Sequence, residues 1–246
     1  QLQLQQKNAE LERLLELREE ALNLREDMSN MLVHDLRNPL GSIMLAADLI
    51  ERYVHNKLPA PIILGKVESI IRSGARLEKM IDTLLFMARL EAGKLIFTPI
   101  PTDLAYLGNE VLADFEFAAQ SRQICLRGKF PLPGHQILVD ASILRRVIDN
   151  LVGNALKFTP SGGEVSLEMC YLEENRLRVR VADTGPGIDE AKQAKIFEKF
   201  EIGAVKQNVA QIGLGLAFCK LVVESQGGTL FLASNQPQGA VFTVEL

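Results

Sequence analysis

The hydrophobic periodicity of this chain changes once, near residues 98–102, and that change limits what the chain can fold into. Before it, apolar residues recur at intervals of three, four and seven, which is typical of long amphipathic helices. After it, short alternating segments rich in β-branched residues lie between shorter helical patterns. The 246 residues suffice for two modest domains. The predicted fold class is α+β: an antiparallel helical hairpin, followed by an α/β sandwich with a mixed sheet.

The first 32 residues have the composition of a long helix, with no Gly or Pro and many Leu, Glu, Gln and Arg. One leucine series is spaced by seven, four and seven residues, and a second apolar series repeats every seven. This predicts a two-stranded coiled coil with a register shift, which we assign to residues 1–28. A single amphipathic helix is the alternative, but it would have little to pack on. The two series are Leu4, Leu11, Leu15 and Leu22, and Leu17, Leu24 and Met31.

Residues 29–97 are predicted to form a helical hairpin that dimerises. The helical pattern continues to about Tyr53, is broken by Pro59 and Pro61, and resumes over about residues 62–92. A lone hairpin would leave much of its apolar surface in water, whereas two hairpins bury it as a four-helix bundle. The sequence therefore predicts a homodimer.

The charge and the cysteines limit the partners and the compartment. The net charge is −4 without a basic block, so nucleic acid or an anionic lipid surface is not expected as the main partner. Three widely spaced cysteines form no metal pattern and suit a reducing, cytoplasmic location. No apolar run reaches the roughly 20 residues that span a bilayer, so no membrane contact is expected in this stretch. Because the chain opens at Gln1 within helical sequence, we expect a fragment of a larger sensor.

A helix predicted for residues 141–158 carries a line of polar side chains opposite its apolar stripe. Asn150, Asn154 and Lys157 follow at intervals of four and three, and so share a face. Amide oxygens are hard ligands that suit Mg²⁺, and a lysine supplies a point charge to phosphate. A solvated face that happens to hold two Asn is the alternative, but Asn is a poor residue for the middle of a helix. The line indicates a site for a Mg²⁺-bound triphosphate.

A second motif, Asp183-Thr184-Gly185-Pro186-Gly187-Ile188, directly follows a predicted strand. Its glycines let the backbone approach a ligand closely. An ionised carboxylate only accepts hydrogen bonds, which favours adenine over guanine, because adenine presents an amino group where guanine presents a carbonyl. A plain Asp-Thr-Gly turn is the alternative.

A third motif, Gly213-Leu214-Gly215-Leu216, opens a predicted helix, whose first N–H groups and positive dipole end favour phosphate. By itself this signal is weak. The polar segment between the second and third motifs, up to Gln211, has the length and the weak pattern of a lid.

In this order the motifs resemble the N, G1, F and G2 boxes of the ATP-binding domain shared by histidine kinases, gyrase B, the Hsp90 chaperones and MutL. The resemblance covers about Leu104 to the C-terminus and implies ATP and Mg²⁺ as cofactors. Residues 98–102 are taken as the inter-domain linker, so the catalytic ATP-binding domain is assigned to residues 98–246. It implies that Asn154 ligates the metal, that Asn150 and Lys157 attend the phosphates and that Asp183 reads the adenine amine. The remaining nucleotide-binding residues implied by the boxes are Phe158, Gly185, Gly187, Gly213, Leu214, Gly215 and Leu216.

Two positions in these boxes carry further information. Asn150 stands where the hydrolytic members have a Glu that activates water, and an amide cannot act as a general base, so the kinase branch is favoured. Gln211 stands where the family usually has Gly, and a side chain there can restrict the lid or slow ATP turnover.

Residues 34–40 (HDLRNPL) resemble the H box of histidine kinases of the largest dimerisation-domain class. A neutral imidazole at His34 is nucleophilic near neutral pH, and Asp35 can take the other ring proton or fix the tautomer. Asn38 lies four residues on and so shares the face of His34; in the family this position can orient the water that dephosphorylates the partner receiver. Pro39 is expected to kink the helix.

These observations predict an ATP-dependent protein-histidine kinase that phosphorylates His34 and then donates to an aspartate on a response-regulator receiver. Phosphatase activity on that receiver, through Asp35 and Asn38, is a further possibility. A nucleotide-binding signalling scaffold is one alternative, and Gln211 is the feature that leans toward it. An ATPase of the gyrase or Hsp90 type is the other, and Asn150 and the H box count against it.

Overall fold

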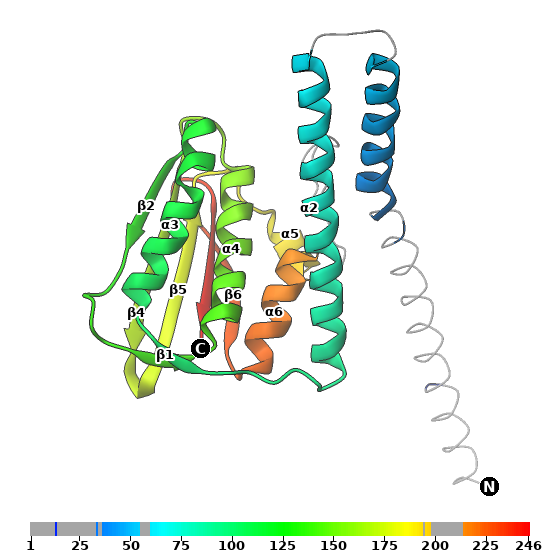
Figure 1. Ribbon diagram of the computed structural model, residues 1–246. Helices are drawn as coiled ribbons and strands as arrows, with labels where there is room; N and C mark the ends of the chain where they lie inside the picture. The colour runs from blue at the N-terminus through cyan, green and yellow to red at the C-terminus, as the bar shows by residue number, and fades with distance from the viewer. Residues whose placement is uncertain (1–12, 14–32, 34–35, 55–59, 194, 198–213) are drawn as a thin grey trace, which may run out of the picture. The chain divides into compact units, whose positions relative to one another are not determined.

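The computed structural model describes residues 13, 33, 36–54, 60–193, 195–197 and 214–246 (Figure 1). The chain divides into two compact units, Gln1–Leu84 and Leu85–Leu246. The predicted coiled coil lies outside the described residues except at Arg13, so it stays a prediction.

The described residues confirm the two predicted helices, one over residues 36–54 and the other α2 (Ala60–Glu91), whose end from Leu85 on belongs to the second unit. They run antiparallel, as expected for a hairpin (Figure 1). Their apolar residues recur in two stripes. Ile63 and Ile70 on α2 are half-buried, whereas Leu64 and Ile71, one position further on, are 60% and 64% exposed.

The second unit is built on a five-stranded sheet in the order β2-β4-β5-β7-β6. The β2–β4 pair is parallel and the other pairs are antiparallel, which confirms the predicted mixed sheet. A separate two-stranded antiparallel sheet joins β1 to β3, so part of the segment expected as a linker is a strand. The strands are β1 (Ile100–Thr102), β2 (Cys125–Lys129), β3 (Ile137–Val139), β4 (Glu164–Leu172), β5 (Arg176–Asp183), β6 (Thr229–Ser234) and β7 (Ala240–Glu245).

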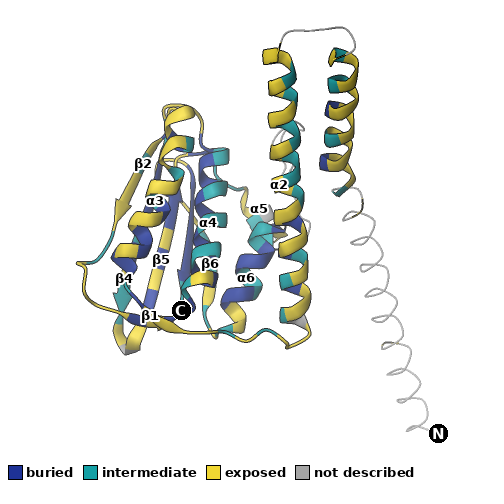
Figure 2. Ribbon diagram, viewed as in Figure 1, coloured by how far each residue is buried: buried dark blue, intermediate teal, exposed yellow. Residues whose placement is uncertain are grey.

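Three helices cover one face of the five-stranded sheet (Figure 1), and the residues between helices and sheet form the buried core (Figure 2). They are α3 (Leu104–Ser121), α4 (Ala141–Phe158) and α6 (Gly215–Ser225). On β5, Leu177, Val179 and Val181 are buried, while the intervening arginines are exposed, as the strand period of two requires. The apolar stripe predicted for α4 is buried throughout: Ile143, Leu144, Val147, Ile148, Leu151 and Ala155.

After β5 the described residues form a short helix, α5 (Glu190–Gln193), and a 3-10 turn, η2 (Lys195–Phe197). Ile196 is buried in this turn. A second 3-10 turn, η1 (Glu173–Asn175), joins β4 to β5.

Asp140 begins α4 and holds it to the preceding chain. Its Oδ1 accepts hydrogen bonds from Ile143 N (3.1 Å) and Ser142 Oγ (2.7 Å), and its Oδ2 accepts from Thr98 N (2.9 Å). Burial raises the pKa of Asp140, but these hydrogen bonds outweigh burial, so the pKa lies below its ordinary value. This carboxylate therefore fixes where the helix that carries the first motif begins.

Candidate nucleotide-binding site

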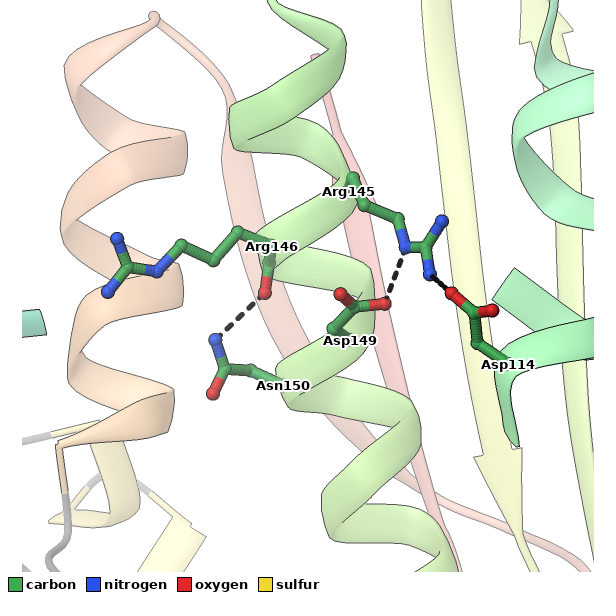
Figure 3. A network of polar contacts seen from close by, with 5 residues as sticks. All are labelled: Asp114, Arg145, Arg146, Asp149 and Asn150. Atoms are coloured by element: carbon green, nitrogen blue, oxygen red, sulfur yellow. Dashed lines mark hydrogen bonds and ion pairs between the residues drawn. The ribbon is translucent and has the colours of Figure 1, made fainter. Parts of the chain in front are cut away.

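Helix α4 carries polar side chains on two sides, as Figure 3 shows. Toward α3, the Arg145 guanidinium donates from Nε to Asp149 (2.7 Å) and pairs with Asp114. Toward α6, Asn150 Nδ2 donates to the backbone carbonyl of Arg146 (2.8 Å). The first side ties α4 to α3, while the second presents the amide oxygen of Asn150 toward α6.

Gly215 brings the third motif against the first. A Cβ built on Gly215 would lie 3.2 Å from Asn150 Oδ1 and 4.0 Å from Asn154 Nδ2. A side chain at this position would crowd the amide of Asn150, so glycine lets α6 begin close to the two amides without displacing them. The first bond of α6 runs from Phe218 N to Leu214 O, so the N–H groups of the preceding turn have no partner within the helix. These N–H groups and the positive end of the helix lie beside the side chains of Asn150 and Asn154. This arrangement is suited to binding a phosphate group.

The end of α4 adjoins the second motif. The ammonium of Lys157 lies 5.4 Å from the centroid of the Phe158 ring, and both side chains are half-buried. A Cβ built on Gly185 would lie 3.1 Å from the carbonyl oxygen of Phe158. Gly185 therefore brings the loop after β5 against the last turn of α4, next to the predicted phosphate residues.

Asp183 ends β5 and is only 6% exposed. Its Oδ1 accepts hydrogen bonds from Gly185 N (2.8 Å) and Ala240 N (3.3 Å). Burial raises the pKa of this carboxyl above its ordinary value, although the two backbone hydrogen bonds oppose that shift. Among the described residues both bonds fall on Oδ1, which leaves Oδ2 for a further donor.

Three residues that contact Asp183 were missed by the sequence analysis, and all lie at the turn between β6 and β7. Asn235 Nδ2 donates to the backbone carbonyl of Asp183 (2.8 Å), and Ala240 N donates to its carboxylate. Gly239 has φ +127°, and a Cβ there would lie 1.8 Å from the Asp183 carbonyl oxygen. The one local signal was a glycine directly before a strand pattern, which is too common to mark a site.

Several predicted site residues lie outside the described part of the chain: His34, Asp35, Gly213 and the predicted lid with Gln211. Asn38 is described; it is exposed on its helix, and its carbonyl accepts from Ser42 Oγ (3.1 Å). Pro39 is buried within helix 36–54. The roles assigned to His34, Asp35 and Asn38, and the kink at Pro39, stay predictions.

The described residues contain no cluster of three or more His, Cys, Asp or Glu that could hold a metal ion. A divalent ion at Asn154 would therefore take its other ligands from phosphate oxygens and water, as Mg²⁺ commonly does. No helix in the described part of the chain is long and apolar enough to cross a membrane.

Two family models match the two parts of the chain. Residues 24–93 match the His Kinase A (phospho-acceptor) domain, and residues 139–246 match the histidine kinase-, DNA gyrase B-, and HSP90-like ATPase. Together they cover the H box and all three nucleotide motifs. The chain belongs to the sensor histidine kinase family.

Relatives and solved structures agree with this membership. The chain is 31% identical over 237 residues to the adaptive-response sensory kinase SasA of Synechococcus sp. (strain JA-3-3Ab), across 94% of this chain and 63% of that protein. It resembles full-length ShkA solved with AMPPNP (TM-score 0.65, 31% identity, 89% of this chain and 45% of that one). It also resembles the kinase ThkA solved with the response regulator TrrA (TM-score 0.66, 25% identity, 93% of this chain and 63% of that one). The chain thus spans under two thirds of each of these proteins.

Proposed function

We propose that this chain is an ATP-dependent protein-histidine kinase that phosphorylates His34 and passes the phosphoryl group to an aspartate of a response regulator. The convergence of three motifs carries the proposal. The polar side of α4, the loop after β5 and the start of α6 come together at two glycines, Gly215 and Gly185, where any side chain would meet a neighbour. Two amides that can border phosphates, a carboxylate that can accept from the adenine amine and a helix N-terminus together suit a nucleoside triphosphate.

The residues present fit ATP with Mg²⁺. Asn154 would ligate the ion and Asn150 would adjoin the phosphates, because both amides border the first turn of α6. When bound, the ion neutralises charge on the transferring phosphoryl group. Lys157 would add a positive charge to the phosphates, and Asp183 Oδ2 would accept from the adenine amine. Asn150 offers no general base, which disfavours direct attack by water.

In the reaction, a ring nitrogen of His34 attacks the γ-phosphorus of ATP. The bond between that phosphorus and the bridging oxygen breaks, and ADP leaves with the electron pair. Asp35 would hold the proton of the other ring nitrogen and so keep the attacking nitrogen unprotonated. An aspartate of the receiver then takes the phosphoryl group from His34. The ThkA structure was solved with a response regulator, which supports this class of partner.

We also propose that the chain acts as a homodimer. The second apolar stripe of α2 is exposed in the single chain, and its members follow intervals of three or four with gaps, as a helical seam requires. A second hairpin would cover this stripe as a four-helix bundle. The stripe comprises Leu64, Val67, Ile71, Ile81 and Leu85.

We further propose that the chain has phosphatase activity on the receiver. Asn38 is exposed on its helix, so its amide can reach a docked receiver and orient a water there. The cytoplasmic location expected from the cysteines is proposed with it.

Radiolabelled ATP with Mg²⁺ tests the kinase proposal. Wild-type protein should acquire an acid-labile, base-stable label and lose it to a receiver domain. His34→Gln should remove the label, while the matched control His135→Gln, whose ring packs on Tyr171 away from the motifs, should keep it. Undiminished label in His34→Gln would contradict the phosphosite. ATP binding without any label would favour a scaffold, and rapid phosphate release without phosphoprotein would favour an ATPase.

A further inference from the structure

We infer that Asn235 is a positioning residue for base recognition: its amide holds the backbone of Asp183, so the β6–β7 turn sets the direction of the base-reading carboxylate. The inference rests on the proposed nucleotide site. Asn235 and Gly239, which carry it, lie outside all three motifs.

The pairing of β5 with β7 stops just short of Asp183, whereas the pairing of β5 with β4 includes it, opposite Val165. Strands β5 and β7 are paired as far as Ala182 and Val241. One residue further, Ala240 N turns to the carboxylate of Asp183, and the carbonyl of Asp183 accepts instead from Asn235 Nδ2 at 2.8 Å. The turn between β6 and β7 thus holds Asp183 by its main chain and by its side chain.

Asn235 is itself fixed at both ends of its amide. Its Oδ1 accepts from Gln236 N (3.0 Å), which orients the amide so that Nδ2 faces the Asp183 carbonyl. Its backbone N–H donates to Gly239 O (3.0 Å) and closes the turn. A side chain held in this way loses little conformational freedom when it makes its bond, which suits a positioning role.

Two glycines make the contact between the loops possible. A Cβ on Gly239 would lie 1.8 Å from the Asp183 carbonyl oxygen, and a Cβ on Gly187 would lie 3.2 Å from Gly239 O. Both glycines also have positive φ, +127° and +74°. The β6–β7 turn and the loop after β5 are therefore in backbone-to-backbone contact, and a shift in one moves the other.

It follows that different residues of the site act on the phosphates and on the base. The α4 amides and the α6 terminus face the phosphates, whereas Asn235 acts only through Asp183, at the base. Loss of the Asn235 amide should let the carboxylate rotate, and this weakens the bond to the base amine. Binding of the phosphates should be unchanged.

The test compares ATP with inosine triphosphate, which carries a carbonyl in place of the adenine amine. Titration calorimetry with Mg²⁺ on the whole chain should show an ATP dissociation constant about 3- to 10-fold higher in Asn235→Ala, the range expected for one hydrogen bond. Affinity for inosine triphosphate should change little, so base discrimination should fall by a similar factor. Autophosphorylation at saturating ATP should keep its rate. The matched control Gln238→Ala, at an exposed residue of the same turn, should leave discrimination unchanged.

A merely structural role would give a different result. If Asn235→Ala lowers the melting temperature and weakens both nucleotides equally, or leaves discrimination unchanged, the inference is wrong while the proposed function stands. If wild-type protein binds no ATP, both are wrong. Gly239→Ala is the second variant: if folded, it should lose discrimination more strongly than Asn235→Ala, and unchanged discrimination there would also overturn the inference.

Discussion

The two units differ in how far their helices bury apolar side chains within one chain. In the α/β unit, Leu151 and Ile148 on α4 are fully buried within one chain. In the helical unit, Leu64 and Ile71 on α2 are 60% and 64% exposed. An amphipathic helix gains most of its stability from burial of its apolar face. The described part of the α/β unit thus buries its apolar core within one chain, whereas the apolar stripe that the helical unit exposes would be covered in the proposed dimer.

The largest effect should come from the core of the α/β unit. Leu151→Ala should lower the free energy of unfolding of that unit by about 3–5 kcal/mol, because it opens a cavity at a fully buried site. Urea unfolding followed at the α/β unit measures this. Leu138→Ala, at a 62% exposed position on β3, is the matched control and should change it by less than about 0.5 kcal/mol. A similar small effect for both would mean that the α/β unit has no such closed core.

In the helical unit, loss of buried apolar surface should weaken dimerisation and not the folding of one chain. Ile71→Glu should remove about 2 kcal/mol of burial per subunit from the proposed dimer, which weakens dimerisation on the order of a thousandfold. Sedimentation equilibrium measures the change, and ATP binding by the α/β unit should be unaffected. Arg72→Ala, at the neighbouring exposed residue, should leave the dimer intact. An undisturbed dimer in Ile71→Glu would place the interface elsewhere.

At the candidate nucleotide site, the α/β unit buries a carboxyl group, that of Asp183, beside its apolar core. Asp183→Asn should keep the bonds from Gly185 and Ala240 but turn an amide donor toward the adenine amine. ATP binding should weaken by about 1.5–3 kcal/mol, as for a lost hydrogen bond to a charged group. Calorimetry measures the loss. An unchanged ATP affinity would remove Asp183 from base recognition.

Asp183→Asn should weaken ATP binding but raise the stability of the folded protein at neutral pH. Because burial raises the pKa of Asp183, the folded state binds the proton more tightly than the unfolded state does. Wild-type stability should therefore fall as pH rises from the ordinary value near 3.8 through the raised pKa, and then level off. Asp183→Asn should lack this fall and be the more stable protein at neutral pH. Unfolding measured from pH 4 to 8 would reveal a constant difference if the carboxyl were not perturbed.

Asp140 should show the smallest effect and the opposite pH dependence. Its pKa is lowered, so its contribution is present above the ordinary value near 3.8 and is lost as pH falls through the lowered pKa. Asp140→Ala should cost about 1 kcal/mol at neutral pH through loss of the helix cap. Asp140→Asn keeps an acceptor oxygen and should lose only the acid dependence. If the difference in stability between wild type and Asp140→Asn stays constant as pH falls, the cap does not depend on this charge.

The contrast between the units also explains what the sequence could predict. The core stripe of α4 and the polar line of Asn150, Asn154 and Lys157 follow from a period that needs only local residues, and the described helix confirms them. The amphipathic run over about residues 62–92 was also predicted, but periodicity does not tell which of its apolar residues face the first helix and which are left exposed. That choice is made by tertiary packing.

Asn235 was not predicted for the same reason, because its contact depends on tertiary packing. Asn235 is bonded to a residue 52 positions earlier in the chain, and no spacing rule links the two. Asp183 was found because its own neighbours, Gly185 and Gly187, mark the loop. Asn235 sits between a strand end and a turn, where Asn is common for local reasons. A side chain that acts only through another residue leaves no local signal.

The bond between Asp183 and Ala240 bears on the time course of folding. It joins residues 57 positions apart, and β7 lies between β5 and β6 in the sheet. Contacts so distant in sequence form slowly, because a long loop must close first. On the ribosome, α3, α4 and β5 emerge well before β7. The carboxylate proposed to read the base therefore gains its second hydrogen bond only after β7 has been synthesised, and a nascent chain that stops short of β7 should not yet discriminate between nucleotides.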